Sequence, residues 1–275
     1  MAKFSKEVVI DRSLEEIYDF LISEDNFRLV PGIDEVEKDK DEEMFNITGR
    51  EKIPFVGLES VCYEIHIDET KRPSSIKFHT VDFMTPTQGS WKLSKTERGT
   101  KVKYDVGYNV PGSFLGKAID KLMVEKNAAK EVDEYISSLK QCLEKVEKIM
   151  TKEIVTVNSS DKASDVTVKM EGTNIRYFPV LKEGKLVGVV TDGDILSKMY
   201  AYGSSSENYP IEKLMTTDVK TVRVDTSVLE VIKLLRKHKI RRIPVVNEND
   251  MLVGIVSATD LEAHFGILTK NNRKK

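Results

Sequence analysis

Two eight-residue stretches of this chain, GVVTDGDI and GIVSATDL, carry the side chains best suited to chemistry. Each begins with a glycine, continues through β-branched apolar residues to a hydroxyl residue, and places an aspartate three positions further on. Asp194 and Asp260 can accept hydrogen bonds from a pair of ligand hydroxyls, while Thr191 and Ser257 can donate to an anion. The same spacing is also a helix-capping pattern, so a purely structural role fits these residues equally well.

The two octets belong to a longer internal repeat. Pro179 aligns with Pro244 at an offset of 65 positions, and Gly188 aligns with Gly254 at an offset of 66. The extra residue falls in a turn, where two copies of one folded unit tolerate a difference in length. Each copy reads as strand, helix, strand, turn, strand and helix. The sequence therefore predicts two copies of one unit, the first over residues 149–205 and the second over 211–268.

The paired octets, the strands FPV and IPV, and the two MT…TV openings resemble the CBS-domain family, named for cystathionine β-synthase. In that family two tandem copies pack as a pseudo-two-fold α/β pair with two clefts, which often bind adenosine-containing ligands. The resemblance implies a CBS-domain pair over residues 147–275. It also implies AMP, ADP, ATP or S-adenosylmethionine as regulatory ligands, with no obligatory cofactor, and a homodimer formed through the pairs.

A nucleotide needs an apolar slot for its base, an acceptor for its ribose hydroxyls and donors for its phosphates. The octets supply the acceptor and some donors, while the strands before them supply apolar walls and arginines. Basic residues gather near the second octet, whereas Asp192 adds a negative charge beside the first, so one or both clefts can be sites. The candidate nucleotide-binding residues are Val157, Arg176, Phe178, Pro179, Gly188, Thr191, Asp194, Val222, Arg241, Arg242, Ile243, Pro244, Gly254, Ser257 and Asp260.

Residues 1–146 share no such repeat and predict a different fold. A strand and short helices come first, and one long amphipathic helix from Ser113 to Glu147 comes last. The strands between them alternate apolar and polar residues, so each buries one face of an antiparallel sheet. The whole chain is therefore expected to be α+β. The candidate strands are residues 33–38, 43–53, 58–69, 75–84, 88–95 and 100–110.

This order of elements, with VIDRSLEEIYDFL near the start, the tripeptide VPG and the segment GSWKL, resembles the START-like or polyketide cyclase-like helix-grip superfamily. There, a curved antiparallel sheet wraps a long C-terminal helix, and a tunnel between them holds a hydrophobic ligand. A filled aromatic core without any tunnel is the alternative. The candidate tunnel residues are Tyr63, Ile65, Phe78, Trp91, Tyr104, Tyr108, Phe114 and Met123.

Metal and catalytic chemistry have little support in the sequence. If Arg72 and Pro73 form the tip of a hairpin, His66 and His79 face each other across two strands. Both are out of phase with their apolar neighbours, so we expect a surface pair and no metal site, with Glu64 the only carboxylate in phase. The chain has no HExxH motif, no glycine-rich phosphate loop and no usable Ser-His-Asp spacing, so no catalytic residue is predicted.

Composition narrows the function classes. The 275 residues are 40% hydrophobic and 32% charged, with a net charge of -2 that leaves no basic footprint for nucleic acid. No apolar run approaches a membrane span, and two distant cysteines suggest free thiols and a cytoplasmic location. We predict a regulatory protein whose CBS pair binds an adenosyl ligand and whose N-terminal domain binds a hydrophobic small molecule. The alternatives are a START-like cyclase, dehydratase or hydrolase under nucleotide control, and a lipid carrier.

Overall fold

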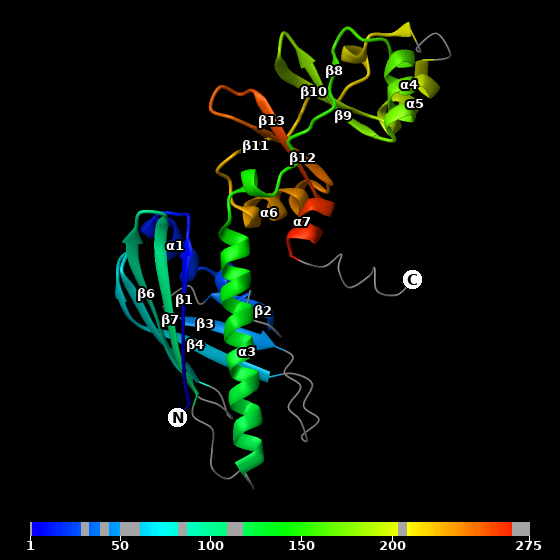
Figure 1. Cartoon of the computed structure of the whole chain (residues 1–275). Coiled ribbons are helices and arrows are strands. Elements are labelled where there is room, and N and C mark those ends of the chain that lie inside the picture. Colours follow the sequence, from blue (N-terminus) through cyan, green and yellow to red (C-terminus); the bar gives the residue numbers. More distant parts are fainter. Residues whose placement is uncertain are drawn as a thin grey trace. The chain divides into compact units, whose positions relative to one another are not determined.

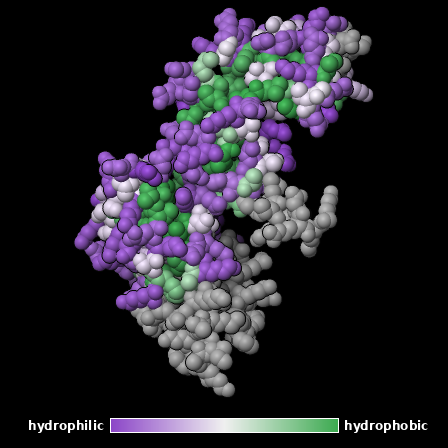
Figure 2. All heavy atoms as spheres, in the orientation of Figure 1, coloured by the Kyte–Doolittle hydropathy of each residue, from purple (hydrophilic) through white to green (hydrophobic). Residues whose placement is uncertain are grey.

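The chain divides into two compact units, Met1–Glu144 and Lys145–Lys275, each of which buries hydrophobic residues of its own (Figure 1). Hydrophilic residues cover most of the visible face, and apolar residues show between them over the strands of the first repeat (Figure 2). The computed structural model describes residues 2–28, 33–38, 44–49, 61–81, 87–108, 118–202 and 208–265.

The described part of the first unit contains a seven-stranded antiparallel sheet with the order β1-β7-β6-β5-β4-β3-β2. Its strands overlap all six predicted ranges, although residues 50–60, 82–86 and 109–110 lie outside the described residues. Pairing of β1 with β7 joins the first strand of the unit to the last. The strands are β1 Ala2–Ile10, β2 Ile33–Lys38, β3 Met44–Gly49, β4 Val61–Lys71, β5 Ser75–Val81, β6 Thr87–Thr96 and β7 Gly99–Tyr108.

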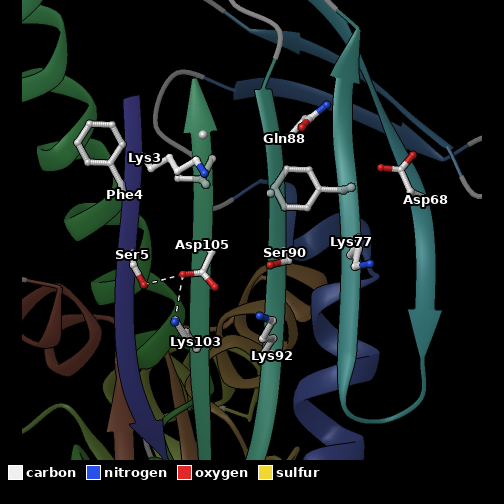
Figure 3. Close-up of a pocket in the computed structure, with 14 residues that line it drawn as sticks. Lys3, Phe4, Ser5, Asp68, Lys77, Gln88, Ser90, Lys92, Lys103 and Asp105 are labelled. Atoms are coloured by element: carbon white, nitrogen blue, oxygen red, sulfur yellow. Dashed lines mark hydrogen bonds and ion pairs between the residues drawn. The ribbon is translucent and has the colours of Figure 1, made fainter. Parts of the chain in front are cut away.

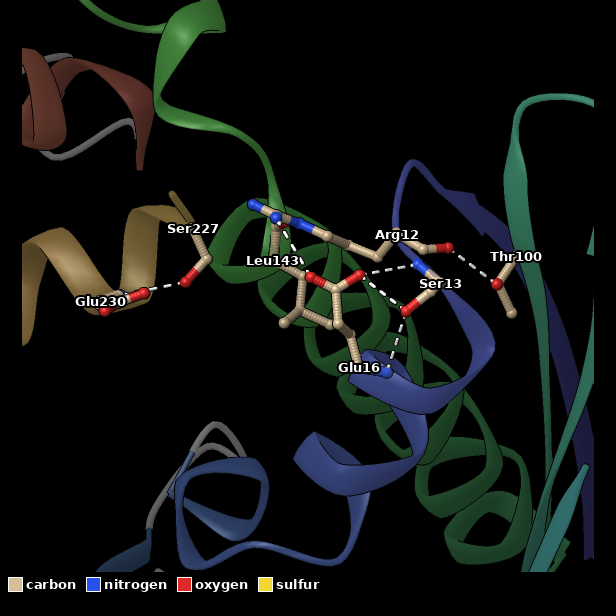
Figure 4. A network of polar contacts seen from close by, with 7 residues as sticks. All are labelled: Arg12, Ser13, Glu16, Thr100, Leu143, Ser227 and Glu230. Carbon is tan, nitrogen blue, oxygen red and sulfur yellow. Dashed lines mark hydrogen bonds and ion pairs between the residues drawn. The ribbon is translucent and has the colours of Figure 1, made fainter. Parts of the chain in front are cut away.

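Two short helices, α1 (Leu14–Leu21) and α2 (Glu24–Phe27), follow β1. A capping box opens α1: the Ser13 hydroxyl accepts from the Glu16 backbone N–H, and the Glu16 carboxylate accepts from the Ser13 N–H at 2.9 Å (Figure 4). Burial acts to raise the pKa of Glu16, but the hydrogen bonds from Ser13 and the charge of Arg12 lower it overall. The capping box therefore favours the ionised carboxylate.

The long helix α3 (Ala118–Leu143) packs against β1, where Lys6 Nζ lies 2.5 Å from Asp133 Oδ1. At its end, the Leu143 carbonyl accepts a hydrogen bond of 2.9 Å from Arg12 Nε (Figure 4). Residues 113–117 of the predicted helix lie outside the described residues. None of the described helices, α3 included, has the length and apolar character needed to cross a bilayer.

The predicted C-terminal end of this helix, at Glu147, was wrong. α3 ends at Leu143, and a 3-10 helix, η1 (Val146–Lys148), follows. The reason is that the backbone amides leave the helical ladder: the N–H of Val146 donates to Thr226 at 2.8 Å, and that of Glu147 donates to Val224 at 3.1 Å. Val146 is fully buried in the core of the second repeat, so it belongs to the second unit.

A buried polar chain crosses the core of the first unit. The Tyr135 hydroxyl donates to Asn26 Oδ1 at 2.6 Å, and Asn26 Nδ2 donates to the Leu21 carbonyl at 2.9 Å. Burial raises the pKa of Tyr135 well above its ordinary value, against a smaller lowering by Trp91 and Asn26. The Trp91 indole N–H also acts on that pKa, but it forms no hydrogen bond with any described residue.

The second unit contains two three-stranded sheets with matching topology, β10-β9-β8 and β11-β12-β13. In each copy a parallel pair is followed by an antiparallel hairpin, and a helix follows the first and third strands, which confirms the predicted order of elements. The elements are β8 Val157–Asn158, α4 Ala163–Thr173, β9 Tyr177–Lys182, β10 Lys185–Thr191, α5 Asp192–Tyr202, η3 Ile211–Lys213, β11 Val222–Arg223, α6 Val228–His238, β12 Arg242–Val246, β13 Leu252–Ser257 and α7 Ala258–His264.

The two copies also share the backbone conformation of the residues that end their first helices. Asn174 is the C-cap of α4, and Lys239, 65 positions later, is the C-cap of α6; both residues adopt the left-handed conformation, with φ of 55° and 53°. Ser227 is the N-cap of α6, and its hydroxyl accepts the Glu230 N–H at 3.2 Å (Figure 4). The two copies are therefore built from equivalent turns as well as equivalent strands.

The two copies exchange their opening segments. Thr151 in the first opening exchanges backbone hydrogen bonds of 2.9 and 3.0 Å with Ile255 on β13. Thr216 in the second opening does the same with Val189 on β10, at 2.8 and 2.9 Å. Each opening therefore lies along the last strand of the other copy.

Candidate functional site

In both octets, the hydroxyl residue and the aspartate form a capping box at the start of a helix. Ser257 donates its hydroxyl proton to Asp260 Oδ2 at 2.6 Å and accepts the Asp260 N–H at 3.2 Å. Thr191 donates to Asp194 Oδ2 at 2.7 Å and accepts the Asp194 N–H at 3.1 Å. Because a hydroxyl has one proton, neither Thr191 nor Ser257 can donate to a phosphate while its capping box is intact.

The second oxygen of each aspartate faces the other copy. Thr216 Oγ1 lies 3.4 Å from Asp194 Oδ1, and Thr151 Oγ1 lies 3.4 Å from Asp260 Oδ1. A contact of that length is weak, so both Oδ1 atoms keep the capacity to accept a ligand hydroxyl. Sequence reasoning missed both threonines, although the repeated Met-Thr dipeptide at equivalent positions was the available signal.

The octet glycines admit a methionine side chain from the other copy. A Cβ atom at Gly254 would lie 2.3 Å from Met150 Sδ, and one at Gly188 would lie 2.5 Å from Met215 Sδ. At Gly188 the Thr216 carbonyl oxygen would lie 3.0 Å away as well. Each glycine is therefore required for close contact between an opening segment and the last strand of the other copy.

Four of the predicted base-contacting side chains belong to the cores of their own copies. Phe178 and Ile243 are fully buried, and Val157 and Val222 are 2% and 6% exposed. In this structure they have almost no surface to offer a base.

The prolines next to them lie on the opposite face of the same strands, because successive strand residues alternate in direction. Pro179 pairs with Val189, and Pro244 pairs with Ile255. Val189 and Ile255 are partly exposed. Val189 also pairs with Thr216 of the second copy, and Ile255 pairs with Thr151 of the first copy. Pro179 and Pro244 are themselves buried, so the apolar surface on this face of the strands comes from the β-branched residues Val189 and Ile255.

The arginines before the strands differ between the copies. Arg176 Nη1 lies 4.0 Å from Asp192 Oδ2. At the equivalent positions the second copy has Arg241 and Ala258, and the Arg241 side chain makes no hydrogen bond or ion pair with any described residue. The second site therefore has an exposed, unpaired guanidinium that the first site lacks.

Tyr177 and Arg242 occupy equivalent positions in the two copies and contact each other. The Arg242 guanidinium lies 5.6 Å from the centre of the Tyr177 ring. Burial raises the pKa of Tyr177 above its ordinary value, against the opposing charge of Arg242. Tyr177 pairs with Thr191, and Arg242 pairs with Ser257, so this contact connects the ends of the two octets.

The candidate tunnel residues of the first unit are described only in part. Phe78, Trp91 and Tyr104 form an aromatic cluster, with the Phe78 and Trp91 ring centres 4.5 Å apart and those of Trp91 and Tyr104 5.6 Å apart. Ile65 is buried on the same face of the sheet. The tunnel itself stays a prediction. The side chains of Tyr63, Tyr108 and Met123, and the whole of Phe114, lie outside the described residues.

A hollow of about 740 Å³ lies on the sheet of the first unit (Figure 3). Its lining includes Lys92, Ser90, Lys103 and Asp105, which alternate along β6 and β7 with the residues of the aromatic cluster. These four side chains therefore project from the face of the sheet opposite Trp91 and Tyr104, but Phe78 of the aromatic cluster also lines the hollow. A lining that mixes charged side chains with Phe78 does not match the purely apolar tunnel that the sequence predicts.

The predicted register of the two histidines is confirmed. His66 and His79 are direct cross-strand neighbours, and their rings stack with centres 5.0 Å apart and planes at 10°. His66 Nε2 lies 2.9 Å from Glu64, and His79 Nδ1 lies 2.6 Å from Asp68. Parallel rings direct their lone pairs along parallel planes, which do not converge on one ion. Among the described residues, no group of three or more metal-binding side chains is placed to hold a metal.

Comparison with known proteins shows which family the second unit resembles. The model of the CBS domain family matches residues 146–201 and 211–265. The CBS domain-containing protein YhcV of Bacillus subtilis is 32% identical over 116 residues, which are 42% of this chain and 81% of that protein. The uncharacterized protein MJ0188 of Methanocaldococcus jannaschii is 33% identical over 119 residues, and the match spans only 42% of its length.

One similar solved structure is the CBS domain pair of protein MJ0100 in complex with 5′-methylthioadenosine and S-adenosyl-L-methionine. It is 31% identical, covers 46% of this chain and 98% of the other, and has a TM-score of 0.41. On the family match and the likeness to YhcV, the chain belongs to the CBS domain family. The resemblance of the first unit to the START-like superfamily stays a prediction.

Proposed function

We propose that this protein is a regulatory ligand-binding protein whose CBS pair binds an adenine nucleotide or another adenosyl ligand. The observation that carries the proposal is the pair of octet aspartates. Each is fixed through Oδ2 by its own capping box, while Oδ1 remains at the junction with the other copy. A rigidly held carboxylate oxygen beside an apolar surface suits a ribose with its two adjacent hydroxyls.

The remaining ligand groups have partners near each octet. Ile255 supplies apolar contact for the base at the second site, as Val189 does at the first, since both side chains are partly exposed. The Arg241 guanidinium supplies the donors for a phosphate. AMP, ADP, ATP and S-adenosylmethionine all share the adenosyl group on which this arrangement depends.

Replacement of Asp260 tests the proposal. Asp260→Ala removes the ribose acceptor and is expected to weaken adenosyl binding by about 1–3 kcal/mol in titration calorimetry, the cost of unpaired hydroxyls. Ser257→Ala is the matched control, because it also breaks the capping box but leaves Asp260 Oδ1 in place. An equal loss in both variants, or no heat from the wild type with AMP or S-adenosylmethionine, would contradict the proposal.

We also propose a homodimer through the CBS pairs. Leu196 and Tyr200 on α5 are 67% and 95% exposed, one helical turn apart, and Val168 on α4 is 68% exposed. The second copy has Lys233 and Glu262 at the positions of Val168 and Leu196. Among the described helices of the pair, the exposed apolar surface therefore lies on α4 and α5 of the first copy, where an isologous contact buries it against the same surface of a second chain.

The oligomeric state tests this contact. Light scattering at micromolar concentration is expected to give about twice the 31.2 kDa chain mass for the wild type. Leu196→Glu should lower that mass, because it places like charges face to face across the two-fold axis. A wild-type protein that is monomeric under these conditions rules the dimer out.

For the first unit we propose binding of an uncharged hydrophobic small molecule. The supporting observation is the Trp91 indole N–H, which is buried beside Phe78 and Tyr104 and has no hydrogen-bond partner among the residues that the structure describes. Trp91 is the single tryptophan of the chain, so its fluorescence reports directly on this region. A hydrophobic naphthalene probe is expected to quench it, and the absence of quenching at saturating probe would contradict the proposal. Catalysis by this unit, as a cyclase, dehydratase or hydrolase, is the alternative.

A further inference from the structure

We infer that the two octet sites of one chain select adenosyl ligands of different charge. The second site takes a phosphorylated nucleotide, and the first takes a neutral or cationic adenosyl compound. This inference rests on the proposed adenosyl binding and adds the ligand class of each site.

At the first octet, the groups that would bind a phosphate are already turned toward the protein. The Arg176 guanidinium lies 4.0 Å from the Asp192 carboxylate, and the Gly193 N–H at the start of α5 donates to Asp192 Oδ1 at 2.9 Å. The nearby cation Lys198 donates to the Leu214 carbonyl at 2.7 Å. A phosphate at this octet would have to displace a carboxylate from each of its first two donors.

At the second octet, the position of Asp192 is occupied by Ala258, which carries no charge. Arg241 is exposed and makes no ion pair with any residue that the structure describes. A second guanidinium, Arg242, is held over Tyr177. Asp260 is the carboxylate that remains for the ribose, so cations outnumber carboxylates here.

The two sites therefore differ in local charge on otherwise equivalent backbones. A phosphate dianion at the first octet meets Asp192 and Asp194 while Arg176 and Lys198 are already engaged with protein groups, and like charges brought together oppose binding. A ligand with a neutral thioether or a cationic sulfonium meets no charge repulsion at the first octet. The positively charged sulfonium is also attracted to the two carboxylates there. Because these side chains are partly exposed, salt should reduce the discrimination between the two sites.

Exchange of the residue types at Asp192 and Ala258 tests the inference. Titrations of the full chain use AMP as the charged ligand and adenosine as the neutral one, with the amide NMR signals of Gly188 and Gly254 reporting which octet is occupied. Ala258→Asp is expected to weaken AMP binding at the second octet by at least about tenfold while leaving adenosine binding unchanged. Asp192→Ala should let AMP bind at the first octet. Ala258→Asn is the matched control, because it adds the same volume without the charge.

Each outcome decides the matter. Equal weakening of AMP in Ala258→Asp and Ala258→Asn would show an effect of size, and AMP binding equally well at both wild-type octets would show no selection; either result overturns the inference. Failure of adenosine to bind at either octet is a different result, because adenosine carries no phosphate. It would overturn the proposed adenosyl binding itself, and the inference with it.

Discussion

Single residues serve both the fold and the site in the second unit. The octet aspartates use one oxygen for a helix cap and leave the other toward the opposite copy. Sequence reasoning recognised both roles, because the spacing Thr/Ser-x-x-Asp encodes the cap and the acidic side chain encodes the acceptor. The contact between Tyr177 and Arg242 could not be predicted, since it depends on how the two copies pack and on no local pattern.

A buried hydrogen bond gives a residue-scale prediction for the first unit. Tyr135→Phe leaves Asn26 Oδ1 without its donor in the core, so the free energy of unfolding should fall by about 1–3 kcal/mol. Denaturant titration followed by Trp91 fluorescence measures this change. Tyr200→Phe is the control, because that side chain is 95% exposed, and it should change stability by less than about 0.5 kcal/mol. Equal, small effects of both replacements would show that the buried bond contributes nothing.

At the scale of elements, the sequence predicted the strands well and the connections between copies poorly. Period-two alternation and turn residues located β2 and β4–β7, and the hairpin at Arg72-Pro73 placed His66 opposite His79. The end of α3 was missed because the apolar stripe continues through Val146, whose backbone pairs with the second repeat instead. Exchange of the opening segments was missed because repeat spacing alone does not say which copy an opening joins.

The octet glycines give a prediction at this scale. Gly254→Ala forces a Cβ atom against Met150 and should destabilise the second unit by about 1–3 kcal/mol, the usual cost of overpacking. Gly188→Ala should cost more, because its Cβ atom also meets the Thr216 carbonyl, which cannot repack as a methionine can. Thermal or denaturant unfolding of the purified variants gives both values.

Gly172 in α4 provides the matched control. A Cβ atom there would have no neighbour within 4 Å, so Gly172→Ala should stabilise the protein by up to about 1 kcal/mol through helix propensity. If all three alanine variants had the same stability, contact between the new Cβ atoms and the methionine side chains would not explain why glycine is needed in the octets.

At the scale of the whole molecule, the connection between the units is short. Only Glu144 and Lys145 separate the last residue of α3 from Val146, which is buried in the core of the second repeat. No Gly/Ser/Pro spacer is present that would let the two units move freely. We therefore expect a ligand that changes the second repeat to act on the end of α3.

This connection predicts coupling between the units. Saturating nucleotide should change the affinity of the first unit for a hydrophobic probe, with a coupling free energy of about 1–3 kcal/mol. Because coupling is reciprocal, the probe should change nucleotide affinity by the same factor. Fluorescence titrations in both directions measure the two ratios. If the affinity for each ligand is the same with and without the other ligand, the two units bind their ligands independently.

Adenosyl binding at the octets is the claim on which the rest depends, and amide hydrogen exchange of the full chain tests it most directly. With saturating AMP, we predict slower exchange over residues 239–260, where β12, β13 and the start of α7 surround the second octet. The first octet, residues 188–195, should respond instead to adenosine or S-adenosylmethionine. Exchange rates that stay unchanged across both octets with all three ligands would contradict the account.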